Sequence, residues 1–282
     1  MYNLRFVSDS GLVYNFGVNG DNVFDSNIGD GISVNIGTSQ GFSQVGQTVE
    51  SRSVEGKPIT IEGVIFRNIE SRKKEMRRVF SPFSSGRMFF NDSYYTRVYV
   101  KNAPTFSPVK GNGKFSMQLF APYPFFYSPT ENNIEIGKIQ PKFKFPVNYA
   151  VPHLFGERTI EKYSNVFNDG DVAVPFSLHM STIFESTNPT VTNLETLEFV
   201  KINGKISSGD VIHIYRDDDM VLRAELTNSD GTKDIISWLD EESSLFELKI
   251  GDNLLMANDD QGGLNLITRF SYKTAVGALY ES

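Results

Sequence analysis

The residues able to act as nucleophiles, acids or metal ligands are few in this sequence. It contains three histidines, His153, His179 and His213, and no cysteine. Without cysteine the chain has no disulfide, no thiolate metal site and no cysteine nucleophile, and this suits assembly in a reducing cytoplasm. His179 and His213 lie inside alternating runs typical of strands, and His153 lies in a proline-flanked segment. None of the three has a serine, aspartate or metal-ligand partner at a spacing that forms a catalytic motif.

Clustered carboxylates are the next candidates, because carboxylate oxygens can hold calcium. The triplet Asp217-Asp218-Asp219 lacks the alternating ligands and the glycine of a calcium loop, and it separates two strand-like runs as a charged turn would. The run from Asp259 to Gly263 has the composition of a hairpin connection. The region from Gly29 to Gly37 lacks the Lys-Ser/Thr pair of a phosphate-binding loop. We therefore expect no catalytic residue, no metal and no cofactor, and we expect that the protein is not an enzyme.

Composition favours a β-rich protein with two cores. The chain has 282 residues, more than one domain usually holds, with 23 Phe and 12 Tyr against one Trp. Aromatic residues favour strands, and the 23 Gly favour tight turns. A net charge of −7 argues against nucleic acid as a main partner. No segment approaches the roughly 20 apolar residues that span a bilayer, and the N-terminus lacks the apolar core of a signal peptide, so we expect no membrane partner.

The first half alternates apolar and polar residues over short segments, which predicts strands. These segments are 4–7, 12–16, 58–66, 87–90, 97–100 and 114–120. In segment 58–66, Ile59 and Ile61 share one face, and the alternation is lost after Gly63, which predicts a possible bulge at that glycine.

One helix is expected in this half, from Asn68 to Phe80. Asn68 is a capping residue, Ile69, Met76 and Phe80 share an apolar face, and Pro82 follows the end of the helix. The other faces carry Arg72, Lys73, Lys74, Arg77 and Arg78. This basic surface is either a solvated helix face or a contact surface for acidic groups of a neighbouring subunit. The residues assigned to the candidate subunit interface are Arg72, Lys73, Arg77 and Arg78.

The domain boundary is expected near Thr130, where the chain leaves its last strand through a proline-rich stretch. Its candidate exit residues are Pro122, Pro124, Phe125 and Phe126. Because prolines stiffen an extended segment and disfavour a central strand, we expect domains at 1–130 and 131–282. In the second half, short strand-like runs recur and Asn203-Gly204 separates two of them, which predicts a hairpin. The spacing of these runs predicts an antiparallel β-sandwich.

Aromatic residues cluster before the boundary. They are Tyr94, Tyr95, Tyr99, Tyr123, Phe125, Phe126 and Tyr127. Most are expected in the core, but exposed ones could contact proteins or stack on sugar rings.

The order and spacing of these segments resemble the N-terminal domain of the phage distal tail protein family, a siphophage tail component of the Dit type. The resemblance runs over roughly residues 30–127. Its parts are the lead-in 46–49, the segment 51–63 (Ser-Arg-Ser-Val-Glu-Gly-Lys-Pro-Ile-Thr-Ile-Glu-Gly), the basic helix ending in Phe80-Ser81-Pro82, and the strand 115–121 with its exit Pro122-Tyr123-Pro124-Phe125-Phe126. That closing strand with its Pro-x-Pro-Phe-Phe exit is the most specific element.

The resemblance implies a virion structural protein at the phage tail tip. It implies an all-β fold with a ring-forming N-terminal domain that carries the helix, and a galectin-like β-sandwich projecting outward. The N-terminal domains would form a hexameric ring, possibly doubled, that joins the tail tube to the baseplate and takes part in host attachment. Implied partners are the tail tube protein, a tail-associated fibre or lysin protein and a receptor-binding protein. In such a ring, the polar stretch from Ser8 to Ser43 would include a hairpin or loop that becomes ordered only at the subunit interface.

Three other interpretations stay open. The chain could be a stand-alone carbohydrate-binding module for cell-wall glycans, as the sandwich and the tyrosines suggest. It could be a cell-wall hydrolase attached to the tail, although it lacks an acid–base pair, or a β-rich scaffold of another kind. Specific nucleic acid binding is not expected, because a tail lumen must let DNA pass without gripping it.

Overall fold

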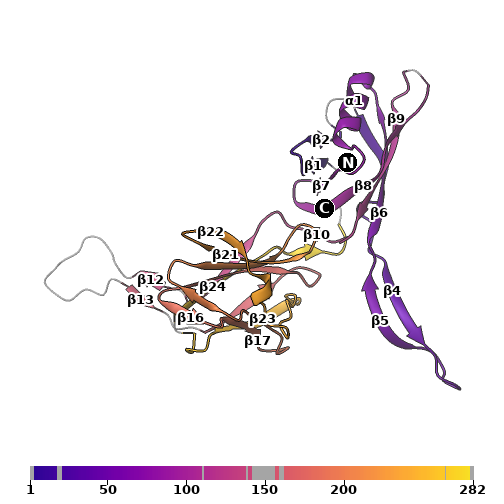
Figure 1. The fold of residues 1–282 in the computed structure, drawn as a ribbon. Coiled ribbons are helices and arrows are strands. Elements are labelled where there is room, and N and C mark those ends of the chain that lie inside the picture. The colour runs from indigo at the N-terminus through magenta and orange to yellow at the C-terminus, as the bar shows by residue number, and fades with distance from the viewer. Residues whose placement is uncertain are drawn as a thin grey trace. The chain divides into compact units, whose positions relative to one another are not determined.

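The computed structural model of the chain describes residues 3–17, 21–109, 111–137, 139–141, 156–158, 162–263 and 265–279. His153 lies outside these residues. The chain divides into two compact units, one made of Met1–Pro129 with Ala275–Ser282 and the other of Thr130–Thr274 (Figure 1). All paired strands in the described ranges are antiparallel, and a single α-helix lies in the first unit, so the predicted all-β fold class is confirmed. The described part of the chain contains no helix of the length and apolarity needed to span a bilayer.

The first unit is built on a nine-stranded sheet in the order β2-β1-β7-β8-β9-β6-β3, to which β10 and β25 are added off this path. Of the last two, β10 pairs with β8, and β25 pairs with β10. The strands of the sheet are β1 (Leu4–Ser8), β2 (Val13–Asn15), β3 (Asp21–Ser26), β6 (Lys57–Ile65), β7 (Ser85–Phe90), β8 (Tyr94–Phe106), β9 (Lys114–Ala121), β10 (Phe126–Tyr127) and β25 (Ala275–Val276). β6 and β9 bury every second residue, as the alternation in their sequences predicts.

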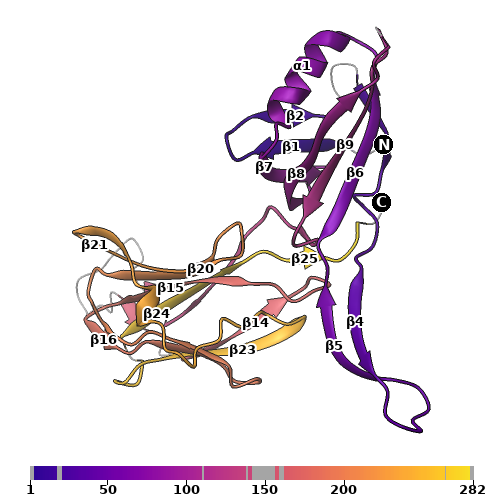
Figure 2. The same cartoon turned by 45° about the vertical axis from the view of Figure 1, so that its right-hand side comes forward.

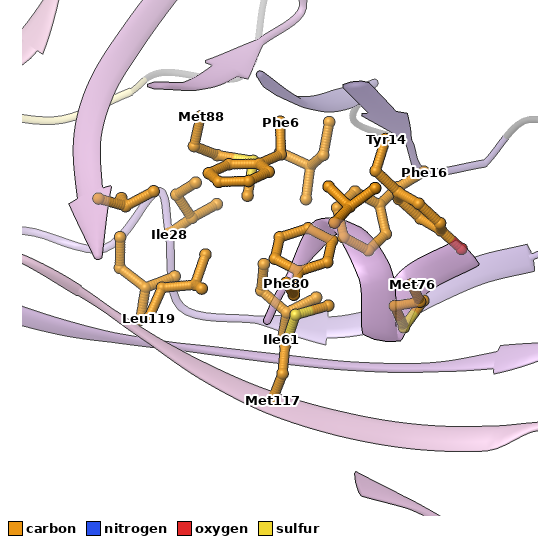
Figure 3. Packing of buried hydrophobic residues seen from close by; sticks show 14 of the residues in the cluster. Phe6, Tyr14, Phe16, Ile28, Ile61, Met76, Phe80, Met88, Met117 and Leu119 are labelled. Atoms are coloured by element: carbon orange, nitrogen blue, oxygen red, sulfur yellow. The ribbon is translucent and has the colours of Figure 1, made fainter. Parts of the chain in front are cut away.

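The buried face of this sheet packs with helix α1 (Ile69–Val79) around a group of aromatic rings (Figure 3). The Phe6 and Phe80 rings are stacked with centroids 4.7 Å apart, and Tyr14 meets Phe80 edge-on at 5.7 Å. Met76 and Phe80 are fully buried, so the predicted apolar face of the helix is confirmed. The core of this unit therefore depends on residues from both ends of its sequence range.

The helix begins differently from the expectation. Asn68 has φ 50°, in the left-handed region, and its side chain makes no capping hydrogen bond. Its backbone oxygen instead accepts from the N–H of Arg72 at 3.0 Å. The prediction of a side-chain cap is wrong, because Asn68 serves as a turn residue that tolerates a positive φ.

Gly63 is required by close packing. A Cβ there would lie 2.4 Å from the backbone oxygen of Asn22 and 2.4 Å from the Phe115 ring. The alternation of β6 continues to its last residue, and the register shift lies in the facing strand β3, between Val23 and Asp25. The bulge predicted at Gly63 is therefore on the partner strand.

A two-stranded hairpin extends the first unit beyond its sheet. Its strands, β4 (Val34–Ser39) and β5 (Thr48–Val54), pair with each other and with no other described strand (Figures 1 and 2). Every residue of β5 is exposed, and so are all but one of β4.

The proline-rich exit packs onto the first unit. Pro124 and Phe126 are buried, Pro122 and Phe125 are half-buried, and Phe126 belongs to the aromatic core. β10 pairs with β8 through Tyr127 and with β25 through both of its residues. Residues 275–279 thus return to the first unit, whereas the sequence placed them with the second half.

The second unit contains two main antiparallel sheets, which lie as two layers (Figure 2). The six-stranded sheet has the order β11 (Asn132–Ile136), β24 (Leu266–Tyr272), β15 (Phe176–Thr182), β20 (Val211–Arg216), β21 (Leu222–Asn228) and β22 (Gly231–Asp234). The four-stranded sheet has the order β14 (Tyr163–Asn168), β23 (Gly251–Asn258), β17 (Thr190–Asn193) and β18 (Phe199–Lys201). Two small pairs, β12 (Ile139–Pro141) with β13 (Gly156–Arg158) and β16 (Glu185–Thr187) with β19 (Lys205–Ser207), and the short helix η1 (Ile236–Trp238) complete the described elements.

Asn203-Gly204 does not close a hairpin. β18 before it pairs with β17, whereas β19 after it pairs with β16. Gly204 lies against Trp238, where an added Cβ would be 2.7 Å from a ring atom. The N–H of Asn203 donates to the Trp238 backbone oxygen at 2.7 Å. The glycine is needed for close contact with an aromatic ring, which a sequence cannot distinguish from a turn requirement.

The run from Asp259 to Gly263 also connects two different sheets, because β23 and β24 lie in separate layers. The Asp259 carboxylate is buried and accepts hydrogen bonds from the Ser186 hydroxyl and the Gly263 N–H, both at 2.6 Å. It is a structural loop residue, and the hairpin prediction is wrong here.

Candidate subunit interface

Arg72 is enclosed within its own chain. Its guanidinium donates to the Asp21 carboxylate at 3.0 Å, to the Asn15 backbone oxygen at 3.2 Å and to Glu75 at 2.8 Å. It also lies 4.2 Å from the centroid of the Tyr14 ring. The Arg72 side chain is 7% exposed and that of Asp21 0%. The assignment of Arg72 to a subunit interface is therefore corrected, because a buried, hydrogen-bonded cation is not available to a neighbouring subunit.

The Asp21 carboxylate joins helix and sheet. The Tyr14 hydroxyl donates to the same Asp21 oxygen at 2.7 Å. Burial, and then this hydrogen bond, raise the pKa of the Tyr14 hydroxyl above its ordinary value. Arg72 thus ties α1 to β3 through this buried ion pair and to β2 through its hydrogen bond to the Asn15 backbone oxygen.

The other predicted interface cations divide into two kinds. Lys73 is buried, with its ammonium 3.3 Å from Glu70 and 5.7 Å from the Phe106 ring centroid. Arg77 and Arg78 are exposed, and the Arg77 guanidinium lies 4.9 Å from the Phe106 centroid. Lys73 packs within the first unit, so its assignment is corrected as well. For Arg77 and Arg78 a subunit contact stays a prediction.

The hairpin β4–β5 was not among the predicted site residues, yet its four aliphatic strand residues, Val34, Ile36, Val49 and Val54, are 44–52% exposed. Its register places Val34 opposite Val54, Ile36 opposite Arg52 and Thr38 opposite Val49. The other face carries only Asn, Ser, Gly and Thr, in the pairs Asn35–Ser53, Gly37–Ser51 and Ser39–Thr48. Because alternate residues point to opposite faces, one face of the hairpin carries all four of its aliphatic strand residues, together with Thr38 and Arg52, and the other face is polar. We call the first the apolar face.

Nothing in the described chain covers the apolar face of this hairpin. Ile36 is 52% exposed and Val49 is 46% exposed, and Phe42 and Val45 in the connecting loop are fully exposed. An isolated two-stranded hairpin is at best marginally stable in water. The alternation of Val34 with Ile36 and the two valines of β5 are a signal that sequence reasoning could have used, but the many polar residues between them obscured it.

The predicted cluster of tyrosines does not form an exposed sugar platform. All its members lie in the first unit, most are buried or half-buried, and Tyr123 is the exception at 37% exposed. The Tyr95 ring packs between Phe89 and Tyr127, with centroids 5.5 and 6.0 Å away. These rings serve packing, as the default interpretation expects.

Two histidines stack on the outer face of the six-stranded sheet. The rings of His179 and His213 lie 3.9 Å apart and nearly parallel, and His213 stacks on Tyr215 at 4.2 Å. The Ser177 hydroxyl lies 2.8 Å from Nε2 of His213. Burial, and then the neighbouring His179, lower the pKa of His213 to about 4. A histidine that stays neutral and is stacked between rings is a structural one.

The acidic triplet forms a turn. Oδ1 of Asp217 accepts from the N–H groups of Asp219 and Val221, and Oδ2 accepts from Arg223. Within the described residues, no group of three or more His, Asp or Glu side chains is placed to hold a metal ion.

Residues 169–274 match the family model of the siphovirus-type tail component, C-terminal domain. No curated protein matches the chain in sequence.

Solved structures resemble the chain over nearly its whole length. The Dit protein of phage SPP1, described as a paradigm of the hub adsorption apparatus in phages that infect Gram-positive bacteria, covers 98% of this chain and 99% of its own, with a TM-score of 0.66 and 13% identity. A chain of the phage P2 baseplate in its activated conformation with Ca covers 99% of this chain and 100% of its own, with a TM-score of 0.56 and 10% identity. The same baseplate with Sr gives a TM-score of 0.54 at 12% identity, with 99% of this chain and 100% of that chain covered.

The matched proteins are tail and baseplate components of phages. Residues 169–274 therefore resemble the siphovirus-type tail component family in sequence, and the chain has the fold of the SPP1 Dit protein over 98% of its length, in agreement with the resemblance to the phage distal tail protein family.

Proposed function

We propose that this chain is a subunit of a hexameric ring, single or doubled, at the distal end of a phage tail. The ring would join the tail tube to the baseplate and take part in host attachment. The second unit, a galectin-like sandwich in this proposal, would hold fibre, lysin or receptor-binding proteins. Assembly would take place in the host cytoplasm, a reducing compartment, and the chain suits it because it has no cysteine and needs no disulfide.

The observation that carries the proposal is the uncovered apolar face of the hairpin β4–β5. An amphipathic β element with one apolar face needs a second surface against it. Contacts between two different patches of identical subunits close into a ring when the rotation between neighbours divides a full turn. A ring would cover the hairpins of all its subunits at once.

Rings of the intact protein test the proposal. We expect light scattering to give the mass of six or twelve chains and negative-stain images to show sixfold rings. The double variant Ile36→Ser/Val49→Ser should abolish the rings, because it removes the apolar face without touching the core of the monomer. The matched control Asn35→Ala/Ser53→Ala changes the opposite face of the same hairpin and should assemble normally.

Two results would contradict the proposal. If the wild-type protein stays monomeric at every accessible concentration, the proposed ring is contradicted. Equal assembly of the two hairpin variants would show that the apolar face has no part in it.

The carbohydrate-binding alternative finds no specific support in the first unit, where the predicted aromatic cluster is packed inward. Binding of cell-wall polysaccharide by the intact protein would revive it. For DNA we propose weak, salt-sensitive binding at most, in keeping with a net charge of −7.

A further inference from the structure

A second uncovered apolar feature of the first unit is the turn that follows α1. This turn consists of Ser81, Pro82, Phe83 and Ser84. It is closed by the Ser84 N–H, which donates to the Ser81 backbone oxygen at 3.0 Å. The two serine hydroxyls lie 2.7 Å apart and brace the turn. Proline at the second position and a positive φ at the third are the features of a type II turn.

Phe83 occupies the position of that turn which glycine normally takes. Its φ is 69°, and its side chain is fully exposed. A bulky residue in the left-handed region is under backbone strain. The chain therefore holds an aromatic ring in solvent in a strained backbone conformation, where glycine would serve the fold of the monomer better.

Phe83 stands at the edge of an open groove of about 900 Å³. The groove is formed where β8 departs from regular pairing with β9, since its register shifts between Val100 and Asn102 and again before Thr105. Tyr99, Val100 and Ala103 supply apolar lining, and Thr60, Ser116 and Gln118 supply polar lining from β6 and β9. The groove thus combines an exposed aromatic edge with a partly apolar floor.

We propose that this groove receives the hairpin β4–β5 of a second copy of the chain, with Phe83 packed on its apolar face. The proposal rests on the proposed ring and names the surface that the hairpin contacts. Groove and hairpin are different patches of one unit, which is the arrangement that a closed ring needs. Aromatic anchors at the centre of such contacts commonly carry most of the binding energy.

Charge also favours this occupant. Lys101 lines the groove, is exposed and has no ion-pair partner in the described part of the chain. On the hairpin, Glu50 is the extra residue at the register shift between Gly37 and Thr38, and it is exposed. The groove therefore offers an unpaired cation and the hairpin an acid at its bulge. Opposite charges across an interface fix register and exclude wrong partners.

Replacement of Phe83 separates assembly from folding. In Phe83→Gly the turn loses its strain, so the monomer should melt no lower than the wild type, while rings should need at least about tenfold more protein to form. Phe184→Ser, which removes an exposed aromatic ring of the second unit, is the control and should assemble normally. Rings of Phe83→Gly that are as stable as those of the wild type would overturn the proposal.

A charge exchange tests the contact directly. Lys101→Glu and Glu50→Lys should each raise several-fold the concentration at which rings dissociate, and the double variant should restore the wild-type value. This pairing would be ruled out if the effects of the two substitutions on the dissociation concentration add in the double variant, or if neither single variant changes it. As long as the wild type forms rings, the proposed function would still stand. Failure of the wild type itself to form rings would instead refute the proposed function.

Discussion

Arg72 is a charged residue of the type usually found on the surface, but it lies buried in the first unit. The sequence places it in a basic run, and the structure places its guanidinium between Asp21, Glu75 and the Tyr14 ring. The helical spacing that exposes Arg77 and Arg78 turns Arg72 toward the sheet. No local pattern reveals this, because Asp21 is 51 residues away.

Reversing Arg72 should destabilise the first unit. In Arg72→Glu a new carboxylate would lie beside the buried Asp21, and loss of one partner of a buried pair costs about 3–5 kcal/mol. Arg78→Glu on the exposed face of the same helix should cost less than about 1 kcal/mol, mainly through the helix dipole. Hydrogen exchange of peptides from β2, β3 and α1 measures both. Equal protection in the two variants would show that the Arg72–Asp21 pair does not hold the helix to the sheet.

The stacked histidines predict a pH dependence for the second unit. The unfolded chain binds a proton on His213 at its ordinary pKa of 6.5, whereas the folded chain binds it only near 4. The contribution of neutral His213 to the free energy of unfolding is therefore fully present above pH 6.5, and it is lost as the pH falls toward 4. His179, whose pKa is also lowered by burial and then by Arg269, adds in the same direction. Glu225, near His213, opposes the shift.

Trp238 reports this effect selectively, because it is the single tryptophan and lies in the second unit. Between pH 6.5 and 4, urea unfolding followed by its fluorescence should show a loss of about 1 kcal/mol from His213, after allowance for its partial exposure. The variant His179→Gln/His213→Gln should lose correspondingly less over the same range. An identical pH profile in both proteins would mean that carboxylates, and not this pair, control the acid sensitivity.

At the scale of elements, local alternation predicted much of the sheet and little of its connections. The segments 58–66 and 114–120 become β6 and β9 because their apolar residues recur every second position. Helix α1 is also predicted from the recurrence of apolar residues, in this case at the spacing of a helix. These elements depend on residues adjacent in sequence, and the sequence is sufficient for them.

The connections fail where a long-range contact decides the conformation. Gly204 accommodates the ring of Trp238 and Gly63 the ring of Phe115, and neither glycine forms the predicted turn or bulge. For a related reason, the only expectation for the candidate site was a hairpin or loop within the polar stretch from Ser8 to Ser43, with no residues assigned to it. The exposure of β4–β5 follows from the absence of any described strand beside it, which the sequence of the hairpin itself does not state.

For the whole molecule, two sequence signals from different halves of the chain resemble the same family. The residues that carried the resemblance lie before residue 128, whereas the family model matches residues 169–274, where no motif was found. The core residues of a β-sandwich are spread over many strands, so the sequence signal of such a domain is not contained in any short motif. The agreement of two independent regions strengthens the assignment more than either does alone.

The path of the chain through both units gives the last prediction. After the second unit, the chain returns to the first, where Ala275 is fully buried and β25 pairs with Phe126 and Tyr127. Val276 and Leu279 pack against the aromatic core, so ending the chain at Thr274 should cost the first unit about 2–4 kcal/mol. Hydrogen exchange should show faster exchange in β8 and β10, while the Trp238 unfolding midpoint stays unchanged. A chain ending at Leu279 keeps β25 and should match the chain of 282 residues. Equal loss in both units after truncation at Thr274 would instead mean that the two units unfold as one, and that the division at residue 130 has no thermodynamic counterpart.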